Sequence, residues 1–301
     1  AYLIHEERRS QFFHALDRNP EGAIAVVFDA TDRIQHMFWR YREPEHPANG
    51  GQDTATFSSA IEEVYQAGDK LVGETLELCG KDDLVLVISD HGFASFRRGV
   101  NLNSWFHQNG YLFLKSDPPD GPAAPLPAGA RIETSEIDWP RTRAYTNGLA
   151  GFYLNIKGRE SGGCVEPDQV RELLNELIEK LRGLPDPAGG QAIRDLWAAI
   201  DCYPGPYRSN APDVLVGYNR GYRADWHAAL GRVTDEAIRD NTRAWSGDHC
   251  MDPDQVPGVV FANRQISRDD PALVDVAPTI LDMFGITAPR HMQGRSFFEV
   301  K

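Results

Sequence analysis

The chain has 301 residues, of which 41% are hydrophobic and 25% charged. This composition is ordinary for a globular protein. The length suits one large domain or two small ones, each with its own buried core. Its formal charge of −13 argues against nonspecific binding to nucleic acid or to an anionic membrane surface. No apolar run approaches the roughly 20 residues needed to cross a bilayer. Four scattered cysteines without a Cys-x-x-Cys spacing indicate neither a disulfide framework nor a zinc knuckle, and they slightly favour a cytoplasmic location: Cys79, Cys164, Cys202 and Cys250.

The first expected element is a charged amphipathic helix over residues 2–18, with apolar positions at Leu3, Phe12, Phe13 and Leu16. An apolar run from Ile24 to Phe28 then predicts a strand.

Asp32 and His36 follow this predicted strand and stand four residues apart. On a helical turn, residues at this spacing lie on one face, so a single metal ion could bind both side chains. Taken alone, such a pair is more often a solvated helix pair than a metal site.

Residues 61–78 carry apolar side chains at helical spacing and predict a crossover helix between the first two strands. The second strand is Val85–Ile88, a β-branched run typical of a strand buried in a parallel sheet. Asp90 and His91 come directly after it, at the sheet edge where ligands collect in open α/β folds. Carboxylates and imidazoles are common ligands of divalent metals, although Asp-His-Gly also occurs in ordinary turns.

Residues 116–140 are rich in proline and predict an excursion from the core, either a solvated loop or an insert beside the substrate cleft. The clearest helix is 167–182, opened by Pro167 and striped with core-forming apolar residues. Further strands are expected at 152–156, 213–218 and 258–263.

His249 lies in a loop of Gly, Asp and Pro just before the last of these strands. Loop histidines are usually unremarkable surface residues. His249 is a candidate metal ligand because the other four candidate ligands also lie near strand ends. Neighbouring Cys250 is more often a packing residue than a ligand.

The order Asp-x-x-x-His, then Asp-His-Gly at a strand end, then Gly-x-His before another strand resembles the alkaline phosphatase superfamily. The resemblance is closest to its type I phosphodiesterase and nucleotide pyrophosphatase-like phosphohydrolases. It extends over nearly the whole chain in the family's order, through the segments DRIQHMFWR (32–40), VNLNSWF (100–106), FYLNIKGRE (152–160), APDVLVGY (211–218) and DVAPTILDMFGI (275–286).

The resemblance implies a single α/β domain over residues 1–301, with a largely parallel sheet flanked by helices. It also implies two divalent metal ions, zinc most readily, with manganese or iron as alternatives. Asp32, His36 and His249 would hold one ion, and Asp90 and His91 would contribute to the other. The implied activity is hydrolysis of a small phosphomonoester or phosphodiester, with no nucleic-acid polymer as partner.

Family members begin with a strand ending in another metal-binding Asp, followed by a Thr or Ser nucleophile near the start of a helix. Nothing before Asp32 fits this pattern, and the chain does not begin with Met. We therefore expect a C-terminal portion that lacks the first strand and the nucleophile helix. It would pair with the N-terminal portion of the same protein and be inactive alone. Ser89, Ser246 and Thr31 are expected to be turn or capping residues.

Four polar residues near the ligands are further candidates for binding the non-bridging phosphate oxygens: Arg33, Asn101, Asn155 and Arg159. Each is individually more common as a surface or turn residue. Two other functions stay open at this point. One is a sulfatase or phosphomutase on the same scaffold. The other is a non-catalytic metal-binding or interaction module.

Overall fold

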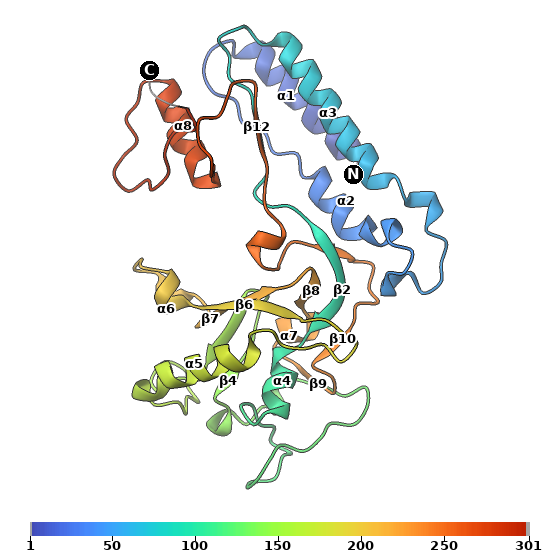
Figure 1. The fold of residues 1–301 in the computed structure, drawn as a ribbon, viewed down its shortest axis with the longest axis vertical. Helices are drawn as coiled ribbons and strands as arrows, with labels where there is room; N and C mark the ends of the chain where they lie inside the picture. The colour runs from blue at the N-terminus through green and yellow to red at the C-terminus, as the bar shows by residue number, and fades with distance from the viewer. Residues whose placement is uncertain (1, 299–301) are drawn as a thin grey trace. The chain divides into compact units, whose positions relative to one another are not determined.

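A computed structural model describes residues 2–298, which form two compact units (Figure 1). The first unit comprises residues 2–36, 57–92 and 257–298, and the second comprises residues 37–56 and 93–256. Mixed helices and sheets in the two units agree with the α/β class expected of an alkaline-phosphatase-like fold. The single domain expected over 1–301 stays a prediction, and its residues 1 and 299–301 lie outside the described chain.

The first unit contains two long helices, α1 (Tyr2–Arg18) and α3 (Ala60–Leu78), which confirm the helices expected at 2–18 and 61–78. They lie side by side in Figure 1, and an ion pair of 2.7 Å joins Arg9 on α1 to Glu74 on α3. The buried residues of α3 recur at helical spacing and form one apolar face, while Glu62 and Glu63 occupy its first turn, where the helix dipole favours negative charge. Two shorter helices are α2 (Ala30–Phe38), whose last two residues belong to the second unit, and α8 (Val276–Met283).

The sheet of the first unit has two antiparallel strands, β1 (Leu86–Ile88) and β12 (Val260–Ala262), with Leu86 opposite Ala262. These confirm the strands expected at 85–88 and 258–263. The strand expected at Ile24–Phe28 is wrong, because the segment has no strand partner in residues 2–298. Its Val27 is 73% exposed. High β-propensity favours a strand only where a neighbouring strand completes the hydrogen-bond ladder.

The second unit contains the larger sheets. One has the order β10-β2-β11, with β8 also paired to β2, and another has the order β4-β5-β7-β6, while β3 pairs β9. Their bounds are β2 (Ala94–Val100), β3 (Arg131–Ile132), β4 (Ala144–Tyr145), β5 (Gly151–Leu154), β6 (Ile193–Ala198), β7 (Val214–Tyr218), β8 (Gly221–Ala224), β9 (Val233–Thr234), β10 (Ile238–Asp240) and β11 (Gly247–Asp248).

The largely parallel sheet is not confirmed. Among residues 2–298 every strand pairing is antiparallel except that of β2 with β8. The apolar run before Asp90 predicted a strand buried on both faces, yet Ile88 in β1 is 41% exposed. An apolar run indicates a strand, but strand direction depends on which segment pairs with it, and that partner is distant in sequence. The expected absence of a first strand is not confirmed either.

The core of the second unit lies between α5 (Val170–Leu181) and the sheet that contains β6 and β7. The apolar stripe of α5 is buried there, as the sequence predicted, through Leu173, Leu174, Leu177 and Leu181. The remaining helices of this unit are short: α4 (Leu102–Gln108), α6 (Ala199–Cys202) and α7 (Trp226–Ala229). Residues 116–130 form turns and bends, within the excursion expected at 116–140. In the described chain no helix has the length and apolar character required to cross a bilayer.

Candidate functional site

Helix α2 brings Asp32 and His36 together. Asp32 lies in the first turn, where the helix dipole favours a carboxylate, and His36 follows one turn later. The His36 Nε2 atom lies 3.4 Å from Asp32 Oδ1. The imidazole is buried, whereas the carboxylate is 40% exposed. The i,i+4 spacing predicted from the sequence therefore produces a carboxylate and an imidazole that face each other.

The segment after β1 adds Asp90 and His91 to the same unit. His91 Nε2 lies 3.9 Å from Asp32 Oδ1 and 3.6 Å from Asp90 Oδ2. The other ring nitrogen, Nδ1, lies 2.9 Å from the Gly92 carbonyl, which can only accept a hydrogen bond. In a neutral ring this contact places the proton on Nδ1 and leaves the lone pair on Nε2, the nitrogen that lies near the two carboxylates. This hydrogen bond is the kind that orients metal-binding histidines.

Antiparallel pairing holds the Asp90–His91 segment in place. The backbone N–H of Ser89 donates to the Val259 carbonyl, and the Ser89 hydroxyl accepts from the Val259 N–H at 2.9 Å. Gly258 is required beside this pairing, since a Cβ there would lie 2.5 Å from the Ser89 carbonyl oxygen. Ser89 therefore extends the pairing of β1 with β12, and no turn is assigned at this residue.

His249 follows β11 in the second unit, and the Asp248 carboxylate holds its backbone. Asp248 Oδ1 accepts the N–H groups of His249 at 2.8 Å and Cys250 at 2.9 Å. The Trp245 indole N–H donates to Asp248 Oδ2 at 2.7 Å. The His249 ring contacts Phe93 edge-on, with ring centroids 5.4 Å apart. Backbone and ring of His249 are therefore both constrained.

Arg223 completes this arrangement. Its Nε lies 2.8 Å from Asp248 Oδ2, and both side chains are only 1% exposed. The guanidinium also lies over the rings of Phe96 and Trp226, at 4.8 and 4.1 Å from their centroids. Sequence reasoning missed Arg223 and Asp248. Asp248 could have been noticed as the neighbour of His249, but nothing in the sequence links Arg223 to that loop.

The liganding atoms of Asp248, His249 and Cys250 lie within 4.8 Å of one another, yet this trio fits a metal ion poorly. Burial and the Asp248 carboxylate raise the pKa of Cys250 to about 11, so the thiol is protonated at neutral pH. The Asp248 carboxylate is already occupied by Arg223 and by N–H donors. His249 is the one member of the trio whose side chain suits a ligand role.

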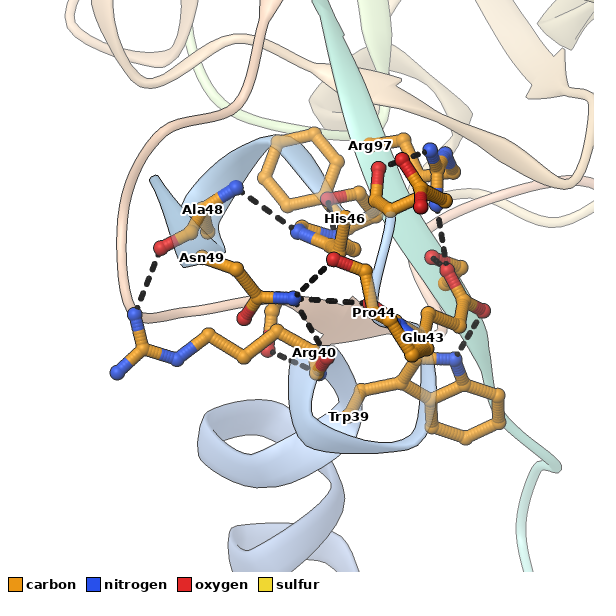
Figure 2. Close-up of polar contacts among 12 residues, drawn as sticks. Trp39, Arg40, Glu43, Pro44, His46, Ala48, Asn49 and Arg97 are labelled. Atoms are coloured by element: carbon orange, nitrogen blue, oxygen red, sulfur yellow. Dashed lines mark hydrogen bonds and ion pairs between the residues drawn. The ribbon is translucent and has the colours of Figure 1, made fainter. Parts of the chain in front are cut away.

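The chain after His36 is tied to β2 through Glu43 (Figure 2). The Glu43 carboxylate accepts hydrogen bonds from Trp39 Nε1 at 2.8 Å, Ser95 Oγ at 2.8 Å and Arg97 Nη1 at 2.9 Å. Burial acts to raise the pKa of Glu43, but these donors outweigh it and hold the pKa below its usual value. Glu43 is thus an ionised anchor for residues 39–49.

His46 and Asn49 complete the same loop. Asn49 Nδ2 donates to the carbonyls of Arg40, Glu43 and Pro44 (Figure 2). His46 is 2% exposed; its Nε2–H donates to the Phe96 carbonyl at 3.0 Å, and its Nδ1 accepts the Ala48 N–H at 3.1 Å. Both contacts require the neutral ring, and burial lowers the pKa of His46. His46 is a structural histidine.

The structure therefore groups Asp32, His36, Asp90 and His91 within the first unit. His249 belongs to the second unit, and its convergence with Asp32 and His36 stays a prediction.

The four residues expected to bind phosphate oxygens each form hydrogen bonds or ion pairs with other residues of the chain. Arg33 pairs with Asp29 at 2.7 Å, and Arg159 pairs with Asp213 at 2.7 Å. Asn101 caps α4 by accepting the Ser104 N–H.

Asn155 is fully buried, and its Nδ2 donates to the carbonyls of Trp139, Thr142 and Gly162. These contacts stabilise turns and helix ends. The substrate-binding role expected for Arg33, Asn101, Asn155 and Arg159 stays a prediction that their contacts do not support.

Comparison with known proteins adds a family. A search among curated proteins found no match. The family model for type I phosphodiesterase / nucleotide pyrophosphatase matches residues 3–249, which is well over half of the chain and a range that contains the five candidate ligands. The chain therefore belongs to the type I phosphodiesterase / nucleotide pyrophosphatase family of the alkaline phosphatase superfamily.

Proposed function

We propose that this protein is a metal-dependent phosphoester hydrolase that uses two divalent ions to cleave a small phosphodiester or phosphomonoester. Family membership supports phosphoester hydrolysis in general. The observation that carries the metal-dependent part is the position of Asp32 Oδ1, which lies 3.4 Å from His36 Nε2 and 3.9 Å from His91 Nε2.

The donor set of the first unit fits a divalent metal. Two ligands that each lie about 2 Å from a tetrahedral ion are separated by about 3.3 Å. The Asp32–His36 separation of 3.4 Å is close to this value, and the His91–Asp90 separation of 3.6 Å is only slightly longer. Imidazole nitrogen with carboxylate oxygen is a ligand set of zinc enzymes, and manganese and iron accept it as well.

We assign Asp32, His36 and His249 to one ion and Asp90 with His91 to the other. When bound, the ions would stabilise negative charge on the phosphoryl oxygens and lower the pKa of the attacking hydroxyl. The contribution of this chain is orientation: the Gly92 carbonyl holds the His91 ring, and Asp248 holds the His249 backbone.

Two of the hydroxyls that flank these ligands in the sequence accept hydrogen bonds from the backbone. Ser89 accepts the Val259 N–H, and Ser246 accepts the Arg40 N–H at 3.1 Å. We assign neither of these serines as the Thr or Ser nucleophile that the family resemblance implies.

The proposal is tested by metal removal and replacement. Metal is removed from the full-length protein with a chelator, and the protein is then reloaded with zinc, manganese or iron. Hydrolysis of p-nitrophenyl phosphate and of bis-p-nitrophenyl phosphate is measured before and after reloading. We expect the stripped protein to be inactive and one metal to restore hydrolysis of at least one substrate. Comparison of the two substrates separates monoesterase from diesterase. Undiminished hydrolysis after complete metal removal, or none with any metal, would contradict the proposal.

A further inference from the structure

An apolar cavity of about 550 Å³ opens in the second unit. Strands β6 and β7 supply Trp197, Leu215 and Val216 to its wall, and Leu149 and Met251 close it from neighbouring loops. Cavities of this volume with mostly apolar walls are typical of small-molecule sites.

The charge around the cavity disfavours a phosphate group there. Its acidic residues are Asp252, which is 2% exposed, and Asp254 at the surface. Arg194 bridges the two carboxylates at 3.0 and 3.1 Å, and Asp252 also accepts the Asp254 N–H. Among the described residues, no Lys, Arg or His lines the cavity, so it suits a neutral group.

The cavity is next to the proposed ligand loop. Cys250 lines it and follows His249 directly in the chain. Asp248 binds the N–H groups of both residues, so their relative position is fixed. A ring nitrogen of His249 also lies within 4.8 Å of the Cys250 Sγ atom, so the cavity wall is within reach of an ester group on a phosphate held near His249.

We propose that this cavity binds the neutral aryl group of the phosphoester substrate, an inference that rests on the proposed function. An aromatic ring suits this wall better than an alkyl chain because Trp197 offers a stacking partner. The sulfur atoms of Met251, Cys202 and Cys250 add polarisable contacts, which favour aromatic rings. The cavity would then select substrates by their ester group, while the proposed metal ligands act on the phosphorus.

The first test compares two inhibitors that differ only in the group placed in the cavity. Both compounds are tested as inhibitors of bis-p-nitrophenyl phosphate hydrolysis by the full-length protein. The inhibition constant of phenylphosphonate should be at least about tenfold lower than that of methylphosphonate. Ala150 lines the cavity and is exposed, so Ala150→Trp should fill the space without disturbing the fold. This variant should lose the preference for phenylphosphonate and bind methylphosphonate within about twofold of wild type. Ala128→Trp, at an exposed turn of the same unit, should keep the preference.

The second test needs no catalysis. Cys202 is exposed and lines the cavity, so its alkylation by iodoacetamide reports occupancy through mass spectrometry of its peptide. Phenylphosphonate should slow alkylation of Cys202 at least about threefold at concentrations where methylphosphonate has no effect. Ala150→Trp should abolish that protection.

The outcomes separate the two proposals. If phenylphosphonate protects Cys202 from alkylation but the protein hydrolyses neither substrate, the proposed function is wrong and the aryl site is supported. If the protein hydrolyses the substrate, both phosphonates inhibit it equally and neither protects Cys202 from alkylation, the aryl site is wrong. The proposed hydrolase function would then still be supported.

Discussion

Arg223 and Asp248 form an ion pair of 2.8 Å in which both side chains are 1% exposed, and the same carboxylate holds the backbone N–H of His249. A buried charge is costly unless it is paired and hydrogen-bonded, and Asp248 satisfies both conditions. The pair thus links the stability of the second unit to the position of the proposed ligand loop.

Removing the cation should destabilise the protein strongly. Arg223→Met keeps much of the apolar contact with Phe96 and Trp226 but leaves Asp248 buried without a counter-charge. We expect a loss of about 3–5 kcal/mol in the free energy of unfolding, measured by urea denaturation. Arg171→Met removes an exposed pair with Asp201 and should leave the urea midpoint unchanged. Equal urea midpoints for the two variants would show that the buried pair contributes no more to stability than the exposed pair.

Asp248 should also affect metal binding at a distance from the ion. Asp248→Asn retains the shape of the side chain but loses the charge that pairs with Arg223 and strengthens its bonds to the N–H groups of His249 and Cys250. We expect at least about a tenfold weaker affinity for zinc, measured by competition with a chromophoric chelator. Asp201→Asn, an exposed control, should bind zinc as wild type does. If Asp248→Asn matches that control, Asp248 does not position the ligand.

His46 should make stability depend on pH. Its pKa is lowered by burial, so the unfolded state binds more protons than the folded state between the folded pKa and the ordinary value of about 6.5. The contribution of His46 is therefore complete above about pH 6.5 and is lost as the pH falls through that window. The difference in unfolding free energy between wild type and His46→Gln should thus be larger at pH 7.5 than at pH 5. A difference that is independent of pH would mean that the neutral ring is not what the fold requires.

Cys250 should be a slow thiol despite its place beside His249. With a pKa of about 11, about one Cys250 side chain in a thousand is thiolate at pH 8. Alkylation of the Cys250 peptide by iodoacetamide should therefore lag behind that of exposed Cys202 and accelerate as the pH approaches 11. Rapid alkylation of Cys250 at pH 8 would contradict the burial that raises its pKa.

Local patterns predicted the local structure well. The helical spacing of apolar residues in 61–78 and 167–182 predicted α3 and α5, because an amphipathic helix carries its pattern within its own sequence. Likewise, the i,i+4 spacing of Asp32 and His36 predicted their approach.

Non-local features were beyond the sequence. Ile24–Phe28 has the composition of a strand but lacks a partner in residues 2–298, and β1 pairs antiparallel with β12 instead of joining a parallel sheet. The pairing of Arg223 with Asp248 joins residues 25 positions apart through tertiary packing, which no spacing rule anticipates. The same holds for the contacts of Asn155, whose three carbonyl partners are brought together only by the fold.

The most direct test of the account is the joint loss of metal and activity in two histidine variants. His36→Ala and His249→Ala each remove one proposed ligand of the first ion, and His14→Ala removes an exposed histidine of α1 as control. Zinc per chain is measured by atomic emission, and hydrolysis of bis-p-nitrophenyl phosphate is measured in the longest natural form. We predict that His36→Ala and His249→Ala each lose metal and hydrolysis together, while His14→Ala keeps both. Full zinc content and full hydrolysis in His249→Ala would contradict the account.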